Sequence, residues 1–499
     1  METELKFALS PQAQRKLERY LSRSGQDGTR HVEVLKTTYF DSADRKLTKA
    51  GFSLRVRQIV NGAQGYRQTV KSDGNGTFRR QEWEWFLDGP QPDLGRLAEV
   101  PAFPLQAAPL ATVKPLFSTE VTRTTFTLRP VPGSTVEMAL DDGAVVASCG
   151  SEPLRELELE LKQGDPGVLV RLALELLETA PLSLFNESKA QRGFELVDGT
   201  RPKPHQAKDV VLPDDLCLKD AFHLLAGRLL DDLMANQPAV LRGDEEEGVH
   251  QMRIDVRRLR SLLVLFAPVL EVHATRHFED ELRRLGQVLG AARDWDVFVE
   301  ETLPRLIDGA ADLAVVRPLR ELASKRRHSS HQAAKKAVLD PSFSRFVLAF
   351  RLWSFEKGAV LKRFAAGDLG EEADHLLSRL ERKVDKRLRA CDKAEPTTLH
   401  RLRKGLKKLR YAIEFFEARY GRGIGPYLKR CNGLQKQLGD LNDLWTFSRL
   451  ADEVAQGQRL DVAPALGLLA ENADRLAMKG LRQLDSRLRR FANAQPFWT

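Results

Sequence analysis

Cysteine and long apolar runs are both scarce in this chain, and each scarcity excludes a class of protein. Four of the 499 residues are cysteines, and none forms a C-x-x-C pair, so reduced thiols are the simplest interpretation. The apolar runs are too short to cross a bilayer, and the polar, acidic start of the chain shows no secretory signal. We therefore expect a cytoplasmic protein with no membrane partner.

Several common catalytic motifs are also missing. The sequence has no Gly-rich Lys-Ser/Thr loop of the Walker type, no H-E-x-x-H and no G-x-S-x-G. What remains is an ordinary globular composition, 42% hydrophobic and 29% charged, long enough for two or three domains. The net charge of +9 comes from 78 basic and 69 acidic residues, so a polyanionic partner is expected only if the bases cluster.

The first 200 residues have the pattern of β-structure. Segments with alternating polar and apolar residues, separated by turns such as Asp141-Asp142-Gly143, occur at 31–40, 52–60, 64–71, 78–87, 119–128, 135–141 and 154–162. Two helical stretches interrupt them, one from Pro11 and one from Pro166 to Glu178. The polar faces carry both signs of charge densely. This favours a closed barrel with a charged lumen and an apolar outside covered by helices.

Two rows of carboxylates stand out in this region. Glu2, Glu4 and Lys6 alternate with apolar or neutral residues, and Glu156, Glu158 and Glu160 repeat the pattern before Lys162. Side chains at i and i+2 share a strand face, and stacked carboxylates repel unless a cation lies between them. One such strand alone is usually solvated. In one β-rich domain with bases on other strands, the rows favour a site for a hard divalent cation.

The remaining strands supply candidate bases for the same lumen. They are Arg55, Arg57, Lys71, Arg79, Arg80 and Arg123, with Lys189 and Arg192 after the second helix. Arginine binds phosphate oxygens in a bidentate manner, and a metal held by carboxylates polarises phosphoryl groups. A chain of phosphates chelated to a divalent metal therefore suits the predicted lumen.

These residues resemble the CYTH superfamily, also called the triphosphate tunnel metalloenzymes. The resemblance covers about residues 1–200 and rests on the opening E-x-E-x-K, Leu54-Arg55-Val56-Arg57, Gln68–Lys71, Arg80–Glu84, the Glu156–Glu160 row and Ser188–Gly193. It implies an eight-stranded antiparallel tunnel with flanking helices that binds triphosphate. The family includes inorganic triphosphatases, thiamine triphosphatases and class IV adenylate cyclases. No aromatic slot for thiamine or adenine is evident in the sequence.

The resemblance also implies roles for individual residues. Phosphate contacts fall on Lys6, Arg55, Arg57, Lys71, Arg123, Lys189 and Arg192, to which we add Arg80. Mg²⁺ or Mn²⁺ would bind Glu2, Glu4 and two of Glu156, Glu158 and Glu160. Which two of the three is left open, and Glu137 is a further inward candidate.

A linker at 201–214 leads to a helical half at 215–499 that contains an internal repeat. Basic residues spaced by 3, 4 and 3 share one helix face in each copy, as His250, Arg253, Arg257 and Arg260 and as His400, Arg403, Lys407 and Arg410. The segments Leu289–Asp294 and Leu438–Asp443 repeat too. One basic ridge alone is usually a solvated face, but two matching ridges favour polyanion binding. His250 and His400 have no His, Cys or Glu three or four residues further along the chain, which argues against zinc.

This half resembles the CHAD domain, the conserved histidine α-helical domain. The duplicated His-x-x-Arg helix and the Leu-Gly-x-x-x-Asp segments carry the resemblance across 215–499. It implies two four-helix bundles and a basic groove that binds inorganic polyphosphate. The whole chain, a multidomain α+β protein, then resembles bacterial CYTH–CHAD triphosphatases.

The first functional hypothesis is a metal-dependent hydrolase that cleaves tripolyphosphate to diphosphate and phosphate, with Glu2, Glu4, Lys6 and Arg57 as catalytic residues. The water's base is left among Glu82, Glu84 and Glu137. The alternatives are a non-catalytic polyphosphate-binding protein and an adenylate cyclase or a nucleotide or thiamine triphosphatase. The expected partners are tripolyphosphate and long-chain polyphosphate, and nucleic acid is not expected. Binding of long-chain polyphosphate would bring the protein to polyphosphate granules.

Overall fold

The computed structural model describes residues 2–23, 30–60, 65–72, 79–101, 103, 112–208, 210–213, 215–307, 310–355, 359–361, 367–455 and 459–498. The chain divides into two compact units. Unit 1 comprises Met1–Pro204, Gln237–Asp244 and Val338–Leu352, and unit 2 comprises His205–Asn236, Glu245–Ala337 and Trp353–Thr499. The first unit thus ends near the predicted linker but also takes in two helical segments from later in the sequence.

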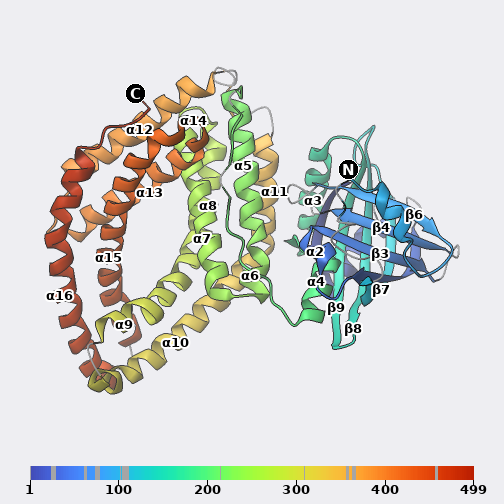
Figure 1. The fold of residues 1–499 in the computed structure, drawn as a ribbon, viewed down its shortest axis with the longest axis horizontal. Coiled ribbons are helices and arrows are strands. Elements are labelled where there is room, and N and C mark those ends of the chain that lie inside the picture. The colour runs from blue at the N-terminus through green and yellow to red at the C-terminus, as the bar shows by residue number, and fades with distance from the viewer. Residues whose placement is uncertain are drawn as a thin grey trace. The chain divides into compact units, whose positions relative to one another are not determined.

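Unit 1 is built on an antiparallel sheet (Figure 1). Its strands are β1 (Glu2–Ala8), β2 (His31–Asp41), β3 (Phe52–Ile59), β4 (Tyr66–Ser72), β5 (Arg79–Arg80), β6 (Glu82–Leu87), β7 (Lys114–Leu128), β8 (Thr135–Ala147), β9 (Gly150–Gln163) and β10 (Ser183–Phe185). Nine of them follow the order β10-β1-β9-β8-β7-β2-β3-β4-β6, and β5 pairs with β1. The prediction of eight strands is therefore wrong, because β10 adds to the edge of β1 and Gln81 separates β5 from β6.

The pairing of β5 with β1 brings the two ends of the sheet together. Thr3 of β1 pairs with Arg79 of β5, and β6 begins only two residues after Arg80. Because β6 also pairs with β4, the strands from β1 round to β6 enclose a lumen. The expected tunnel is confirmed in this form.

The predicted turn at Asp141-Asp142-Gly143 is wrong, because β8 continues through it to Ala147. A Cβ at Gly143 would overlap the backbone carbonyl of Glu120 on β7. The glycine therefore permits a close approach of two strands rather than a chain reversal. Asp141 becomes an inward-facing strand residue as a result.

Apolar side chains face outward from the strands and are covered by helices. Leu5, Leu157 and Leu159 are almost fully buried where α1 (Pro11–Arg23) and α3 (Pro166–Thr179) pack on the sheet. Leu54 and Val56 of β3 pack in a separate cluster with Leu97 of the short helix η1 (Leu94–Glu99). Where these helices cover it, the sheet is thus dry outside, and charged side chains line its lumen, as the sequence predicts.

Helix α4 (Lys189–Asp198) packs against β7, β8 and β9. Phe194 belongs to an apolar cluster with Phe117, Val121 and Leu154. These three residues occupy the alternate positions of their strands that face inward. Arg45, beside α2 (Lys46–Lys49), donates hydrogen bonds to Asp198 at the C-terminal end of α4. These contacts fix a helix whose first residue, Lys189, reaches the lumen.

Two later helices, α6 (Gln237–Arg242) and α11 (Pro341–Phe355), are grouped largely with this sheet. Gln237 donates a hydrogen bond to the carbonyl of Leu184 on β10, and the Leu184 amide donates one to the Ser344 hydroxyl. The extra strand β10 therefore gains its partners from residues far along the chain. Nothing in the local sequence of 237–242 signals this.

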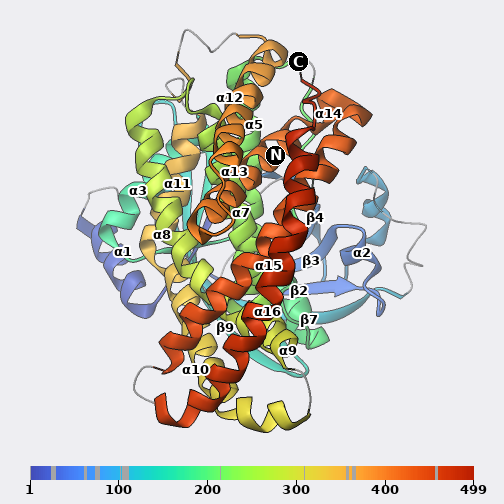
Figure 2. The same ribbon diagram turned by 90° about the vertical axis from the view of Figure 1, so that its left-hand side faces the viewer.

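Unit 2 is helical, as predicted (Figures 1 and 2). Its helices are α5 (Leu218–Ala235), α7 (Glu245–Phe266), α8 (Val272–Asp296), α9 (Leu303–Leu306), most of α10 (Ala310–Leu339), α12 (Leu369–Arg389), α13 (Pro396–Phe415), α14 (Glu417–Tyr420), α15 (Gly425–Ala455) and α16 (Arg459–Ala492). The repeated histidines lie in α7 and α13, and the repeated aspartates in α8 and α15. Long helices α15 and α16 lie side by side in Figure 2 and pack on each other.

No helix in the described part of the chain has a stretch that is both long and apolar enough to span a bilayer.

The packing of α4 leads to a first prediction. A Cβ at Gly193 would overlap the ring of Phe117, so Gly193→Ala should lower the free energy of unfolding of unit 1 by about 1–3 kcal/mol through overpacking. Gly89→Ala is the matched control, because no atom lies within 4 Å of its added Cβ. Urea unfolding followed by circular dichroism measures both changes, and equal midpoints would contradict the packing of α4 on Phe117.

Candidate functional site

The lumen of unit 1 contains a cavity of about 630 Å³ lined mainly by charged side chains. The charges are segregated by strand. Basic side chains on β3 and β4 form one wall, with Arg55, Arg57, Arg67 and Lys71. Carboxylates on β1, β8 and β9 form another, with Glu4, Glu137, Glu158 and Glu160. Neighbouring strands add Glu82, Glu84 and Arg123, and α4 adds Lys189.

The basic wall carries a guanidinium with little local compensation. Arg57 donates a hydrogen bond to the Thr37 hydroxyl at 3.2 Å, and no carboxylate in the described ranges lies within 4.0 Å of it. Burial, followed by the like charges of Arg55 and Arg123, lowers the pKa of Arg57 to about 10. Removing a cation from water in this way is costly unless an anion approaches it. The wall is therefore built to receive negative charge.

Three carboxylates of the acidic wall lie in one row across neighbouring strands. Glu4 pairs in register with Glu160, and Glu160 pairs with Glu137 on its other side. Side chains directly opposite each other in this way have Cβ atoms about 4.5–5.5 Å apart. These carboxylate oxygens are ligands of the kind that Mg²⁺ or Mn²⁺ takes. Lys6 lies 3.1 Å from Glu4 and Lys162 lies 2.6 Å from Glu160, so the residues present fit a divalent cation that displaces these two lysines.

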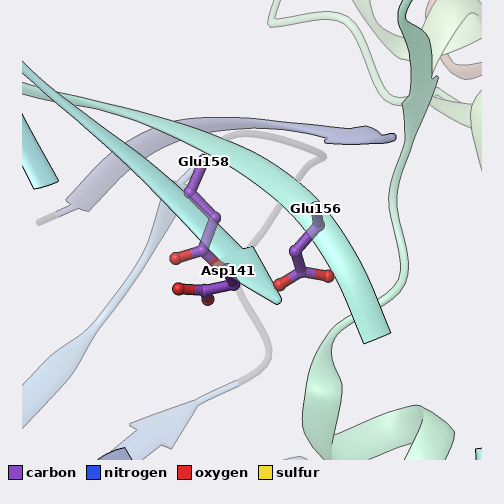
Figure 3. Close-up of side chains that lie close together, drawn as sticks. All are labelled: Asp141, Glu156 and Glu158. Carbon is purple, nitrogen blue, oxygen red and sulfur yellow. The ribbon is translucent and has the colours of Figure 1, made fainter. Parts of the chain in front are cut away.

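A second carboxylate cluster lies deeper in the same wall (Figure 3). Oxygens of Asp141, Glu156 and Glu158 lie within 4.8 Å of one another, which is ligand-like spacing. However, the Lys189 ammonium lies 2.8 Å from Asp141 and 2.9 Å from Glu158 and also contacts Glu156. Arg123 forms a bidentate pair with Asp141 and contacts Glu158. Lys189 thus already occupies the position that a cation would take.

The pKa shifts follow from this arrangement. Burial disfavours charge on every carboxylate of the cluster, but Lys189 and its neighbouring cations outweigh burial and lower the pKa of Glu158 and Asp141. For Glu156 burial dominates and raises the pKa. In the opposite sense, the carboxylates raise the pKa of Lys189 despite its burial. The cluster is a self-neutralised support for the acidic wall.

The structure brings most of the predicted tunnel residues together. Glu4, Lys6, Arg55, Arg57, Lys71, Glu82, Glu84, Arg123, Glu137, Glu158, Glu160 and Lys189 all line the cavity. Glu156 does not line it and is instead buried against Lys189. Arg192 donates a hydrogen bond to the Pro153 carbonyl, away from the lumen. The side chains of Glu2, Arg79 and Arg80 lie outside the described part of the chain, although their backbones pair β1 with β5.

Sequence reasoning missed two charged residues of this wall system, Arg67 and Asp141, and assigned no role to Lys162, which it placed on the face of the acidic row. Arg67 shares its strand face with Lys71, four residues on, and lines the cavity. Asp141 shares a face with Glu137, but its sequence neighbours imitate a turn. Lys162 lies 2.6 Å from Glu160. Strict alternation places all three on the lumen face, four residues from Lys71, four from Glu137 and two from Glu160.

Unit 2 brings the two basic ridges together where α7 meets α13. Two cavities, of about 240 and 360 Å³, share four basic side chains: Arg253, Arg257, Arg403 and Lys407. His250 lines the smaller cavity, and His400 and Arg260 line the larger one. Arg410 lines neither and lies over the ring of Tyr411, 4.6 Å from its centroid.

The Leu-Gly-x-x-x-Asp segments explain how the arginines are held. Arg253 passes 3.7 Å from the position of a Cβ on Gly290 and donates a hydrogen bond to Asp294, one turn further along α8. Arg403 passes equally close to Gly439 on α15, with Asp443 one turn on attracting it. The glycine makes room for the guanidinium and the aspartate orients it. Asp294 is thus a direct partner of a nearby arginine.

The cluster around Lys189 leads to a prediction about stability. Lys189→Met leaves three buried carboxylates without their shared cation and should destabilise unit 1 by about 3–5 kcal/mol at pH 7. Since Glu158 and Asp141 have lowered pKa values, their stabilisation is present above the unfolded values of 4.5 and 3.8 and is lost as the pH falls. The difference between variant and parent should therefore shrink below about pH 4.

Unfolding of the two proteins across pH 3–8 measures this difference. Lys162→Met is the control, because Lys162 is 42% exposed and its loss should cost less than about 1 kcal/mol. A Lys189→Met protein as stable as the parent at pH 7 would show that the cluster does not depend on the lysine.

Comparison with known proteins agrees with this division of the chain. Residues 1–194 match the CYTH domain family, and residues 225–452 match the CHAD domain family. An inorganic triphosphatase of Haemophilus influenzae is 32% identical over 202 residues, which are 39% of this chain and 54% of the relative. The chain thus spans about half the length of that relative.

Two further relatives cover the helical part. An uncharacterized protein of Mycobacterium tuberculosis is 26% identical over 373 residues, 70% of this chain and 68% of the relative. The crystal structure of the CHAD domain from the plant Ricinus communis is 31% identical, with a TM-score of 0.50, and the match covers 57% of this chain and 96% of that one. The chain belongs to the proteins in which a CYTH domain precedes a CHAD domain.

Proposed function

We propose that unit 1 hydrolyses inorganic tripolyphosphate to diphosphate and phosphate with the help of Mg²⁺ or Mn²⁺. The observation that carries this proposal is the position of Arg57, which faces an enclosed lumen beside Arg55 and Arg123 without a nearby carboxylate among the described residues. A linear triphosphate supplies several negative oxygens, which suits Arg57 together with the neighbouring Arg55 and Lys71, although these two already share Glu82 at 3.3 Å.

The remaining lumen residues have roles that follow from their positions. Arg55, Arg57 and Lys71 would bind phosphate oxygens from one wall, and Lys6 and Arg123 from the other. Glu4, Glu137 and Glu160 would hold the divalent cation, which when bound withdraws charge from the phosphoryl oxygens. Glu158 is engaged by Lys6, Arg123 and Lys189 and would support that wall.

In the reaction, water attacks a terminal phosphorus in line with the bridging oxygen. A P–O bond forms to water, the bond to the bridging oxygen breaks, and diphosphate leaves. Glu82 and Glu84 face the lumen as acceptors for the proton of the water, since Glu137 is assigned to the cation. The arginines offset the charge that develops on the leaving oxygen, and most of the acceleration comes from positioning.

Two features favour a hydrolase over a protein that only binds polyphosphate. The acidic row of Glu4, Glu137 and Glu160 would repel a polyanion unless a metal lies between them, so a pure binder gains nothing from it. The similarity to the Haemophilus influenzae inorganic triphosphatase also extends over 202 residues, which is about the length of the CYTH match at 1–194. Neither feature favours a nucleotide or a thiamine ester as the substrate.

We propose further that unit 2 binds long-chain inorganic polyphosphate through the larger of its two cavities. Ten basic residues line it, and the described lining contains no acidic one: Arg253, Arg257, Arg260, Arg387, His400, Arg401, Arg403, Lys404, Lys407 and Lys408. Such a surface releases condensed counterions when it binds a polymer of negative charge. Binding of this kind would place the protein at polyphosphate granules in the cytoplasm.

The hydrolase proposal predicts the behaviour of Glu4→Gln. Loss of one metal-ligating charge should cost several kcal/mol of transition-state stabilisation, on the order of a thousandfold in kcat, while the polar lumen keeps its fold. Release of phosphate from tripolyphosphate, ATP and thiamine triphosphate, with Mg²⁺, Mn²⁺ or a chelator, measures the effect and the substrate preference together.

Glu120→Gln is the control, because Glu120 lies on the outward face of β7 and is 52% exposed in its pair with Lys36. It should retain parental activity. Normal turnover by Glu4→Gln would remove the acidic row from the mechanism, and tripolyphosphate binding without hydrolysis in the parent would favour the binding protein.

The polyphosphate proposal predicts the effect of charge reversal. Arg257→Glu with Lys404→Glu should weaken polyphosphate binding by at least about tenfold per charge at low salt, and the loss should shrink as salt rises. These cations repel one another, so their replacement should not destabilise unit 2. Arg320→Glu with Arg326→Glu on exposed positions of α10 is the charge-matched control. Equal affinity of the two double variants would refute the cavity as the binding surface.

A further inference from the structure

The two cavities of unit 2 share a wall made of four cations. Arg253 and Arg257 come from α7, Arg403 and Lys407 from α13, and all four line both cavities. The smaller cavity also contains Arg293, Asp294, Glu301 and Asp443, whereas the described lining of the larger one is entirely without carboxylates. An anion in the larger cavity therefore meets the four cations directly.

Lys407 is a member of this wall that, like Arg257 and Arg403, has no carboxylate within 4.0 Å among the described residues. Arg253 is paired with Asp294 at 3.3 Å, and Arg403 is attracted by Asp443. No carboxylate in the described ranges lies within 4.0 Å of the Lys407 ammonium. The titratable and charged groups that line its two cavities come from several elements. They are His400, Arg401, Arg403, Lys404, Lys408 and Tyr411 on its own helix, His250, Arg253, Arg257 and Arg260 on α7, Arg387 on α12, Arg293 and Asp294 on α8, and Asp443 on α15, together with Glu301.

The internal repeat shows what is particular about this position. Arg253 corresponds to Arg403, and Arg260 to Arg410, but the partner of Lys407 in the first copy is Arg257. Arginine remains charged in almost any surroundings, whereas lysine loses its proton when it is buried among like charges. The wall thus combines three permanent cations with one that can titrate.

The surroundings favour the neutral form of that lysine. Burial, followed by the positive charges of Arg257, Arg403 and Arg253, lowers the pKa of Lys407 to about 6. Burial also lowers the pKa of His250 and His400, so both imidazoles are neutral at pH 7. In the absence of an anion the wall therefore carries one charge fewer than its composition suggests.

We propose that unit 2 takes up one proton when it binds polyphosphate in the larger cavity, and that Lys407 receives this proton. The inference rests on the proposed binding of polyphosphate by unit 2. Phosphate oxygens beside the lysine supply the negative charge that the protein does not, which makes the ammonium the stable form. By reciprocity, the proton raises the affinity for polyphosphate by the same factor by which polyphosphate raises the affinity for the proton.

The sign of the pH dependence follows. A group whose pKa is higher in the complex than in the free protein strengthens binding as the pH falls through that interval. Polyphosphate affinity should fall by up to about tenfold per pH unit between pH 6 and 8, and should level off below about pH 6. A proton taken up by His400, which lines the same cavity, would also be taken up by Lys407→Arg, so that variant separates the lysine from the histidine.

Calorimetric titration of the full chain with inorganic polyphosphate tests this inference. The titrations are made at pH 7 in buffers of different ionisation enthalpy, with a chelator present so that the tunnel does not turn over the ligand. The slope of the observed enthalpy against buffer ionisation enthalpy should give about one proton taken up per site in the parent. Lys407→Arg should bind at least as tightly at pH 8 and take up close to no proton, because its charge is permanent.

Lys404→Arg is the matched control, since Lys404 is exposed, lines the same cavity and should leave the proton uptake unchanged. Any proton bound in the tunnel is common to all three proteins and cancels in the comparison. Binding without proton uptake in the parent would overturn the inference and leave polyphosphate binding intact. Equal uptake by Lys407→Arg and the parent would assign the proton elsewhere and also overturn it, whereas no binding at all would refute the proposed function itself.

Discussion

A closed sheet that turns its charged face inward must neutralise those charges within its own walls, and unit 1 is organised by this constraint. Water cannot screen the lumen as it screens an exposed sheet face, so each carboxylate needs a cation nearby. Lys189 meets that need for Asp141, Glu156 and Glu158 together. Because Lys189 is the first residue of α4, the packing of that helix on Phe117 also determines the charge balance of the acidic wall.

The same constraint explains which charges remain for a ligand. On β9, Glu156 and Glu158 are committed to the protein, and Glu160 faces the cavity with Glu4 and Glu137 beside it in register. On β3, Arg55 has Glu82 at 3.3 Å, but Arg57 two residues along has only the Thr37 hydroxyl among its described hydrogen bonds. Arg57 is thus a cation of β3 with no carboxylate within 4.0 Å among the described residues, whereas Glu4 and Glu160 face the cavity with Lys6 at 3.1 Å and Lys162 at 2.6 Å. Residue type alone does not distinguish these residues from their neighbours on the same strand.

The sequence was sufficient to predict the two halves, the tunnel and its segregated charges, because alternation along a strand and 3-4-3 spacing along a helix are local patterns. It was not sufficient where a distant segment decides the outcome. Asp141-Asp142-Gly143 looks like a turn, and only the approach of Glu120 on β7 shows that the glycine lies inside a strand. The count of strands failed for a similar reason, since β10 has its hydrogen-bond partners at Gln237 and Ser344.

Charge pairing was the least predictable property of the site. Arg192 matches the pattern of a phosphate ligand, but it lies on a face of α4 that meets the Pro153 carbonyl rather than the lumen. Arg67 was overlooked, although its parity with Lys71 places it in the cavity. In both cases the residue type is right for phosphate, and the deciding fact is which way a helix or strand face points after packing.

The two units differ in how they would neutralise a phosphate chain. The lumen of unit 1 faces a basic wall with an acidic row, so it matches a chain that carries its own divalent cation. The larger cavity of unit 2 has no carboxylate among its described lining residues, so it matches a phosphate chain without bound metal. The cations of this cavity would therefore compete with divalent metal for the phosphate chain. If both proposals hold, free divalent cation should favour occupancy of the tunnel at the expense of the helical cavity. The same polymer would then be divided between the units by its state of chelation rather than by its length.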